Sequence, residues 1–263
     1  MSYVFDVNDA LNYERWAADE KNRLILDLQR RLMVDMLRPG FAQSLLDIGC
    51  GTGFSLMPFF NKGIELTGID PSPYMLEMAG KNLGSRVDLH RGYAENLPFE
   101  DNCFNYSIIF LTLEFCDDPL RALEEACRVT RDRIFIGIFN RFSLYVAHRR
   151  FIRIIRASVY DNACFLSIGE IRRMLFSLLG KVPLRWRTVY QLPWLPASLV
   201  YRMESTEIFQ SSPFGGFAGI VVDPLPRFRA VPLALRCRVK HPGSSGERVA
   251  SCAGDCRNEK LEN

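Results

Sequence analysis

Short apolar runs alternate with helical patterns along the first half of the chain. The runs cover residues 44–49, 64–70, 86–91, 104–111 and 133–139, and each has the length of a buried strand. Between them, apolar residues recur every three or four positions over 53–61, 73–83 and 119–129, as in amphipathic helices. This alternation predicts an α/β fold built on a parallel sheet.

Capping residues mark where two of these helices begin. Ser72 precedes Pro73, so we expect Ser72 as the N-cap and Pro73 as the first helical residue. Asp117 and Asp118 precede Pro119 and place carboxylates at the positive end of the next helix dipole.

The flanking segments are also periodic. From about Tyr13 to Leu37 apolar residues form a helical stripe, which Pro39 and Gly40 terminate. After the fifth strand, the pattern predicts a basic amphipathic helix over 143–159 and a helix over 167–179 that begins with a Ser167–Glu170 capping box. It then predicts strands over 182–192 and 217–222, separated by a Pro-rich helical linker over 193–213. From residue 224 onward, Pro, Gly, Ser and charged residues dominate, which predicts a flexible tail.

Three glycines follow the first strand, in the sequence LLDIGCGTG over residues 45–53. Because glycine has no Cβ, such a turn lets a ligand lie directly on the main chain. The G-x-G-x-G spacing differs from the G-x-G-x-x-G of dinucleotide-binding turns, and no Lys-Ser/Thr pair follows as in a phosphate-binding loop. The second strand ends in Asp70, 17 residues after Gly53, where a carboxylate can accept two hydrogen bonds from a ribose diol. Together these features predict a nucleotide-binding site.

The chain resembles the class I S-adenosylmethionine-dependent methyltransferases, in the type 11 family that includes ubiquinone- and menaquinone-biosynthesis-like enzymes. The resemblance rests on LLDIGCGTG, GIDPSPYMLEMA and YAENLPFEDNCFNYSIIFLTLEFCDDP, and it covers about residues 5–223. It implies a Rossmann-like, doubly wound, three-layer α/β/α fold whose seven-stranded sheet is mostly parallel, with an antiparallel last strand. The implied domains are an N-terminal helical lead-in over 1–43, a methyltransferase domain over 44–223 with a helical acceptor-side insertion over 141–180, and the tail over 224–263.

The resemblance also implies S-adenosyl-L-methionine as the cofactor and a set of residues that hold it. These residues are Asp47, Gly49, Cys50, Gly51, Gly53, Asp70, Pro71, Ala94, Glu95 and Leu111. The glycine turn would line the methionine side, Asp70 would hold the ribose, and Ala94 and Glu95 would border the adenine. Asp47 has a second interpretation, in which it only holds the glycine turn by accepting backbone N–H bonds. Where the family has an acid beside the adenine, this chain has Tyr93, which can stack on or cover the ring.

No catalytic residue is predicted, because methyl transfer from a sulfonium depends mainly on holding donor and acceptor in line. A general base is needed only where the acceptor must lose a proton early. The acceptor-side candidates are Tyr13, Glu114, Asn140, Arg141 and His148. Tyr13 and Trp16 match the F-D…Y-x-x-W start of family members loosely, and they can equally pack their helix onto the sheet. His148 can equally lie on a solvated helix face, and Phe115 replaces a histidine that the family often has.

Charge is distributed unevenly along the 263 residues, whose net charge is +3. Residues 1–140 carry 14 Lys/Arg and 21 Asp/Glu, a balance of −7, whereas 141–263 carry 19 and 9, a balance of +10. Residues 141–190 include ten basic residues and only two acidic ones. Two interpretations stay open: a solvated helix face, or a surface that meets an anionic acceptor, an anionic lipid surface or a nucleic acid. Nucleic acid is disfavoured because the chain has no N-P-P-Y-type motif and no recognisable RNA-binding domain.

Other features favour a cytoplasmic protein. The N-terminus lacks the apolar core of a signal peptide, and no run of 18 apolar residues predicts a membrane span, although peripheral membrane contact is compatible with the basic half. Cys50, Cys116 and Cys127 fall in predicted helices or strands and are interpreted as reduced core thiols. The spacing of Cys237, His241, Cys252 and Cys256 does not match a zinc site, so no metal is predicted. Nothing in the sequence indicates an oligomeric state.

These observations leave three hypotheses. The first is a S-adenosylmethionine-dependent methyltransferase that acts on a small-molecule or lipid-like acceptor. The second is a S-adenosylmethionine- or nucleoside-binding module without transfer activity, suggested by the substituted positions Tyr93 and Phe115. The third, a NAD-dependent oxidoreductase, is disfavoured by the G-x-G-x-G spacing.

Overall fold

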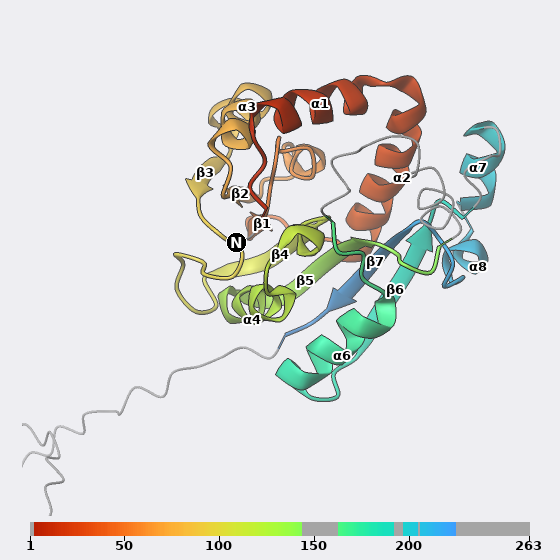
Figure 1. The fold of residues 1–263 in the computed structure, drawn as a ribbon. Helices are drawn as coiled ribbons and strands as arrows, with labels where there is room; N and C mark the ends of the chain where they lie inside the picture. Colours follow the sequence, from red (N-terminus) through yellow and green to blue (C-terminus); the bar gives the residue numbers. More distant parts are fainter. Residues whose placement is uncertain (1–2, 144–162, 192–196, 205, 225–263) are drawn as a thin grey trace, which may run out of the picture. The chain divides into compact units, whose positions relative to one another are not determined.

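The computed structural model describes residues 3–143, 163–191, 197–204 and 206–224, and these belong to one compact unit. At its centre lies a seven-stranded sheet with the order β3-β2-β1-β4-β5-β7-β6 (Figure 1). Its strands are β1 (Ser44–Ile48), β2 (Glu65–Asp70), β3 (Asp88–Arg91), β4 (Phe104–Phe110), β5 (Thr130–Phe139), β6 (Leu184–Val189) and β7 (Phe217–Val222). The first five run parallel, and β7 is antiparallel to both β5 and β6. This topology confirms the predicted fold.

Helices and short 3-10 turns connect and cover the strands. They are α1 (Val7–Ala18), α2 (Glu20–Leu37), η1 (Met57–Phe59), α3 (Pro73–Leu83), η2 (Gly84–Arg86), η3 (Leu113–Phe115), α4 (Pro119–Val129), α6 (Ile168–Leu179), α7 (Ala197–Glu204) and α8 (Glu207–Gln210). The predicted caps are present: the side chains of Ser72 and Asp118 cap α3 and α4, and Ser167 and Glu170 form the capping box of α6.

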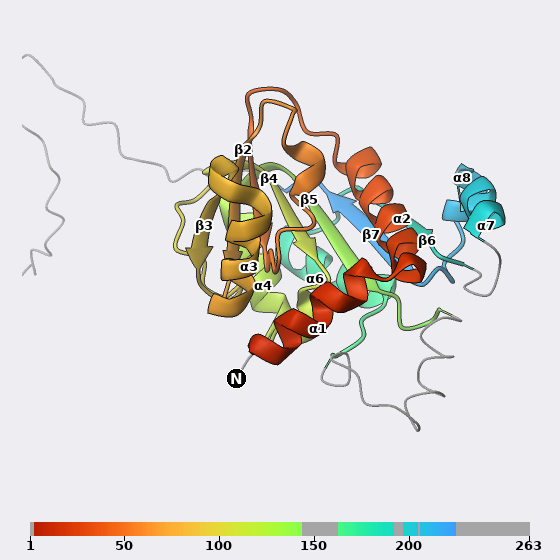
Figure 2. The same cartoon turned by 90° about the horizontal axis from the view of Figure 1, so that it is seen from above.

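Both faces of the sheet are covered, which explains why its central strands are apolar without interruption. On one face, Leu32 of α2 and Leu83 of α3 belong to a single apolar cluster with β1 and β2. On the other face, Leu123 of α4 and Leu175 of α6 pack against the same sheet. The three layers match the predicted α/β/α arrangement. Helix α1 contacts both α3 and α2 and runs between them (Figures 1 and 2).

The prediction of one helix from Tyr13 to Leu37 is wrong in its start and its continuity. Helix α1 begins earlier because Asp6 and Asp9 form a capping box, which the apolar pattern alone does not show. It ends at Asp19, whose backbone is extended, with φ −65° and ψ 131°, and α2 starts at the next residue. The break lets the two helices take different directions (Figure 2).

The predicted helix over 53–61 is also wrong. Only the 3-10 turn η1 forms there, between turns on either side. Pro58 lacks a backbone N–H and cannot continue a helical hydrogen-bond ladder, which explains the short element. Leu56 and Phe59 are nevertheless fully buried, so the apolar positions were identified correctly although the helix was not.

Several predictions concern residues outside the described part of the chain. They include most of the basic helix over 143–159, part of the linker over 193–213, and the tail over 224–263 apart from its first residue. Among the residues described, none of the helices combines the length and the hydropathy that a membrane span requires.

Two glycines that face each other across β5 and β7 make room for aromatic rings beneath α2. Gly137 pairs with Gly219 in the antiparallel ladder. A Cβ added to Gly137 would lie 2.5 Å from Cζ of Phe217, and one added to Gly219 would lie 2.9 Å from Cε2 of Phe135. Leu32 of α2 closes over the same position, because its Cδ2 would lie 3.1 Å from a Cβ on Gly219. These glycines therefore set how closely α2 approaches the sheet.

Gly219→Ala should destabilise the protein by about 1–3 kcal/mol, because the added methyl overpacks a filled core. Gly80→Ala is the matched control: it lies within α3, where a Cβ would have one contact, at 4.0 Å from Leu89. That change should be neutral or stabilising by about 0.5–1 kcal/mol, since alanine is the better helix former. Urea denaturation of the three proteins measures both effects. Equal stabilities for Gly219→Ala and wild type would contradict the packing argument.

Candidate functional site

A cavity of about 570 Å³ is lined by residues from the carboxyl ends of β1, β2 and β4. Ligands bind at this edge in open α/β sheets, because the loops that leave the strands diverge there. Four segments form the wall: the glycine turn after β1, the turn after β2 with the loop after β3, the segment after β4, and the N-terminal segment with α1.

The glycine turn is tied to the neighbouring strand β2. The N–H groups of Gly49 and Cys50 both donate to the carbonyl of Ile69, at 2.8 and 3.0 Å. Gly49 has φ +75°, and a Cβ there would lie 2.3 Å from the side chain of Thr112, so only glycine fits. Gly51 also has a positive φ, of +51°, and a Cβ added to it would meet nothing within 4 Å. The turn therefore presents bare backbone to open space in the cavity.

Asp70 joins the glycine turn to the start of α3. Its Oδ2 accepts the N–H of Gly51 and its Oδ1 accepts the N–H of Ser72, each at 2.9 Å. The side chain is 7% exposed and lines the cavity. Burial raises the pKa of Asp70, while the two backbone hydrogen bonds lower it. Each carboxylate oxygen can accept more than one hydrogen bond, so the group can also receive ligand hydroxyls.

Asp47 and Gly53 do not line the cavity, although both were candidates for cofactor binding. Asp47 is fully buried behind the glycine turn, where its Oδ2 accepts the hydroxyl of Ser55 and its Oδ1 has no partner among the described residues. Burial raises the pKa of Asp47 to about 7; the Ser55 hydrogen bond opposes this shift, and the charge of Asp70 adds to it. The structure thus places Ser55, not Asp47, at the cavity wall.

The remaining cofactor candidates all line the cavity, namely Gly49, Cys50, Gly51, Asp70, Pro71, Ala94, Glu95 and Leu111. Tyr93, which stands in place of the family acid, lines it too and is 48% exposed. Leu111 is a non-glycine residue with φ +54°, a conformation that costs roughly 1 kcal/mol and that clusters at functional sites. Its N–H donates to the carbonyl of Gly137 at 2.9 Å, which holds the strained turn.

The N-terminal segment forms a wall that the sequence pattern did not predict beyond Tyr13 and Trp16. The N–H of Tyr3 donates to the carbonyl of Phe115 at 3.2 Å, and Ser72 Oγ donates to the carbonyl of Phe5 at 2.6 Å. The rings of Tyr3 and Phe5 lie 5.3 Å apart, and those of Phe5 and Phe115 lie 4.9 Å apart. The segment therefore connects the end of β4 to the start of α3 at the cavity. In the sequence, only the loose match to the F-D…Y-x-x-W motif indicated that the N-terminal segment reaches the cavity.

Of the four acceptor-side candidates in the described part of the chain, only Tyr13 lines the cavity. Burial raises the pKa of Tyr13 to about 12; the charge of Arg30 opposes this shift, and that of Asp47 adds to it. Its hydroxyl is therefore protonated at neutral pH and can donate a hydrogen bond, but it cannot act as a base. The Trp16 ring lies 5.9 Å from the Tyr13 ring and extends the aromatic wall.

Glu114, Asn140 and Arg141 do not line this cavity, so their role as acceptor-side groups stays a prediction. Glu114 is buried, and its Oε1 accepts the N–H of Phe139 at 2.7 Å. Asn140 donates to the carbonyls of Pro213 and Gly215, at 2.7 and 3.1 Å. Arg141 forms an ion pair with Glu170 at 2.8 Å. Glu114 thus holds the end of β5, Asn140 the loop before β7, and Arg141 the start of α6, while His148 lies outside the described residues.

Within the described part of the chain, no group of three or more His, Cys, Asp or Glu side chains is arranged to hold a metal ion. The tail cysteines and His241 lie outside that part. The cavity therefore offers hydrogen-bonding groups, bare backbone and aromatic rings as its means of binding.

Comparison with known proteins shows similarity to methyltransferases. Residues 46–135 match the family model described as a methyltransferase domain. A demethylmenaquinone methyltransferase of Paenarthrobacter aurescens is 39% identical over 113 residues, which is 42% of this chain and 44% of that protein. An uncharacterized protein of Methanocaldococcus jannaschii is 29% identical over 228 residues, 84% of this chain and 99% of its own length. A crystal structure from Thermotoga maritima is described as a S-adenosylmethionine-dependent methyltransferase and possible histamine N-methyltransferase. It superposes on this chain with a TM-score of 0.66 at 25% sequence identity, and the match covers 83% of this chain and 97% of the Thermotoga maritima chain.

Glu114→Gln should change how stability depends on pH. Burial raises the pKa of Glu114 from 4.5 to about 7, while the N–H of Phe139 opposes the shift. Between these values the unfolded chain has Glu114 ionised and the folded chain has it protonated, so rising pH destabilises the wild type. The Gln variant lacks this titration and keeps an acceptor for Phe139. Relative to wild type, its free energy of unfolding should rise by about 1–3 kcal/mol between pH 4.5 and 7, then level off.

Chemical denaturation of both proteins at several pH values from about 4.5 to 8 measures this difference. Any constant effect of the substitution displaces the two stability curves equally at every pH. Two parallel curves would contradict a raised pKa for Glu114.

Proposed function

We propose that this chain is a class I S-adenosylmethionine-dependent methyltransferase and that it transfers a methyl group from S-adenosyl-L-methionine to a small-molecule or lipid-like acceptor. The observation that carries the proposal is one cavity that joins the bare backbone of the glycine turn, the buried carboxylate of Asp70 and an aromatic wall. The matched family segment, 46–135, contains the first two of these features.

The residues of the cavity suit this cofactor. Asp70 is held by two backbone hydrogen bonds and has acceptor capacity left for the ribose hydroxyls. Gly51 leaves open space where a side chain would otherwise stand, which suits the methionine part. Ala94 and Glu95 supply the wall for the adenine. When bound, S-adenosylmethionine supplies a methyl group on a sulfonium, which is already activated for displacement.

The chain contributes positioning and water exclusion. Holding two reactants in line at contact distance removes much of the entropic barrier to a bimolecular displacement. The strained turn at Leu111 and the tethered glycine turn give the cofactor wall a defined position. Tyr3 and Phe5 cover the cavity with rings that are themselves anchored at Phe115 and Ser72. No base is assigned, because methyl transfer from a sulfonium depends mainly on holding donor and acceptor in line.

We infer a ring-bearing acceptor that carries no negative charge. Aromatic side chains dominate the part of the wall that remains after the cofactor residues are removed, and they include Phe54, Phe110 and Trp16. None of the described lining residues is Lys, Arg or His, so the wall offers no cation to an anionic acceptor. Two of the compared proteins have names that refer to ring-bearing acceptors, demethylmenaquinone and histamine.

A binding module without transfer activity is the alternative, because Tyr93 and Phe115 replace family residues and both line the cavity.

A cytoplasmic location is also part of our proposal. The five described cysteines are free thiols, which suits a reducing compartment.

Titration calorimetry of the full chain tests the cofactor. S-adenosylmethionine and S-adenosylhomocysteine should both bind, and NADH should not. Asp70→Ala should weaken binding of both sulfur ligands by about 1.5–3 kcal/mol, as expected for hydrogen bonds to a charged group. Asp88→Ala, which removes an exposed carboxylate from β3, should leave the affinity unchanged. Unchanged affinity in Asp70→Ala would remove this residue from the site, and no binding to wild type would refute the proposed function.

Transfer of labelled methyl from S-adenosylmethionine tests the acceptor. Neutral acceptors such as a naphthoquinol or a catechol should be methylated at least about tenfold faster than their carboxylate-bearing analogues, because burying an unpaired anion costs more than this difference. Preference for the anionic analogues would contradict the inferred acceptor class. Cofactor binding without transfer to any of these acceptors would favour the binding module.

A further inference from the structure

The loop between β3 and β4 supplies part of the cavity wall but has no regular structure of its own. Tyr93, Ala94 and Glu95 line the cavity, and the loop continues to Asn102 without a helix or strand. A loop without backbone ladder bonds takes its position from other contacts. At its start, the N–H of Gly92 donates to the carbonyl of Asp70 at 3.2 Å. Most of the polar side-chain contacts of the loop come from one helix, α4.

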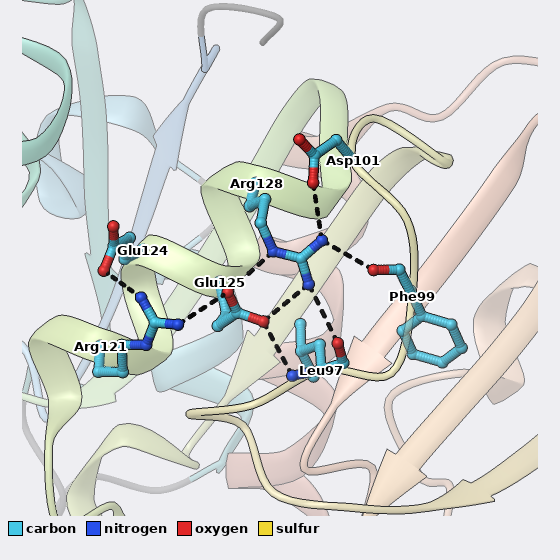
Figure 3. A network of polar contacts seen from close by, with 7 residues as sticks. All are labelled: Leu97, Phe99, Asp101, Arg121, Glu124, Glu125 and Arg128. Carbon is cyan, nitrogen blue, oxygen red and sulfur yellow. Dashed lines mark hydrogen bonds and ion pairs between the residues drawn. The ribbon is translucent and has the colours of Figure 1, made fainter. Parts of the chain in front are cut away.

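Arg128, in the last turn of α4, donates to three groups of the loop (Figure 3). Its Nη2 donates to the carbonyl of Leu97 at 3.0 Å, and its Nη1 donates to the carbonyl of Phe99 at 2.7 Å. Nη1 also contacts Oδ1 of Asp101 at 2.9 Å. One planar guanidinium thus spans five residues of the loop, which a Lys ammonium could not do with the same geometry.

Glu125 completes the arrangement one turn earlier on the same helix. It binds Arg128 through both oxygens, at 2.8 Å from Nε and 2.7 Å from Nη2. Its Oε2 also accepts the N–H of Leu97 at 2.9 Å, so Leu97 is bound through both of its backbone groups (Figure 3). The Glu125 side chain is only 4% exposed. Its hydrogen bond is the largest of the influences that raise the pKa of Arg128, so the pair stays ionised.

Helix α4 is itself held firmly by the sheet. Ala122, Leu123 and Ala126 are fully buried in the apolar cluster of that face. Beyond the N-terminal end of α4, the N–H of Asp117 donates to Oε1 of Glu95 at 3.1 Å. The loop is therefore attached to α4 and its flank at both ends, and its position follows that of the helix.

We propose that Arg128 and Glu125 are positioning residues that hold the cavity-lining loop and thereby set selectivity for the purine base of the bound nucleoside. This inference rests on the proposed function, since it takes the loop as the adenine wall. Selectivity between purines depends on hydrogen-bonding groups placed within a few tenths of an ångström. A buried ion pair is often no better for stability than an apolar replacement, which favours a role in positioning.

Arg128→Met in the full chain tests the proposal. The dissociation constants of S-adenosylhomocysteine and S-inosylhomocysteine are measured by calorimetry, because these ligands differ only at the purine edge. Wild type should prefer the adenine ligand. In Arg128→Met the selectivity ratio, which is the Kd of S-inosylhomocysteine divided by that of S-adenosylhomocysteine, should fall about five- to tenfold, the size of one lost hydrogen bond.

Arg121→Met is the matched control. Arg121 lies on the same helix and contacts Glu124 at 2.6 Å and Glu125 at 3.5 Å, but none of its contacts reaches the loop (Figure 3). It should keep the wild-type ratio. An equal loss of affinity for both ligands in Arg128→Met, with the ratio unchanged, would reduce Arg128 to a stabilising residue and overturn the proposal.

A milder variant covers the case in which Arg128→Met does not fold. Asp101→Asn removes one charged partner and leaves the Arg128–Glu125 pair intact. The selectivity ratio of this variant should also fall, by a smaller factor than in Arg128→Met. An unchanged selectivity ratio in the folded variant would overturn the proposal. If wild type binds neither ligand, the proposed function fails as well. Binding of S-adenosylhomocysteine with unchanged selectivity in the variants refutes only the positioning role.

Discussion

The carboxylate of Asp70 connects the parts on which the site depends. It accepts one N–H from the glycine turn, at Gly51, and one from the start of α3, at Ser72. The hydroxyl of Ser72 in turn holds the carbonyl of Phe5, which anchors the N-terminal segment. One buried acid thus relates three segments that are distant in sequence. Its position follows from the parallel sheet, in which β1 and β2 end side by side.

The same edge of the sheet contains further buried acids whose ionisation is disfavoured. Burial raises the pKa of both Asp47 and Glu114 to about 7, and each has one oxygen without a partner among the described residues. Such groups lower stability wherever the folded chain must ionise them. Buried acids that lower stability in this way and lie near a cavity are typical of binding and catalytic sites.

The wall of the cavity combines two kinds of support. Backbone hydrogen bonds hold the glycine turn and the strained turn at Leu111 against neighbouring strands. Side-chain contacts hold the loop after β3, where Arg128 and Glu125 replace the missing ladder bonds. Groups on rigid elements are placed more accurately than groups on free loops.

The sequence by itself determined the strands and, among the residues that line the cavity, the glycine turn and Asp70. Apolar runs and cap residues depend on local periodicity, and the glycine turn and Asp70 depend on short spacing, so both can be recognised in one chain. Only the tertiary structure decided which polar residues reach the cavity. Asp47 lies near the end of β1, and Glu114 and Asn140 follow β4 and β5, yet their side chains bind neighbouring segments and do not line the cavity. Tyr3, Phe5 and Ser55 enter it because contacts between distant segments place them there, and such contacts leave no periodic signal in the sequence.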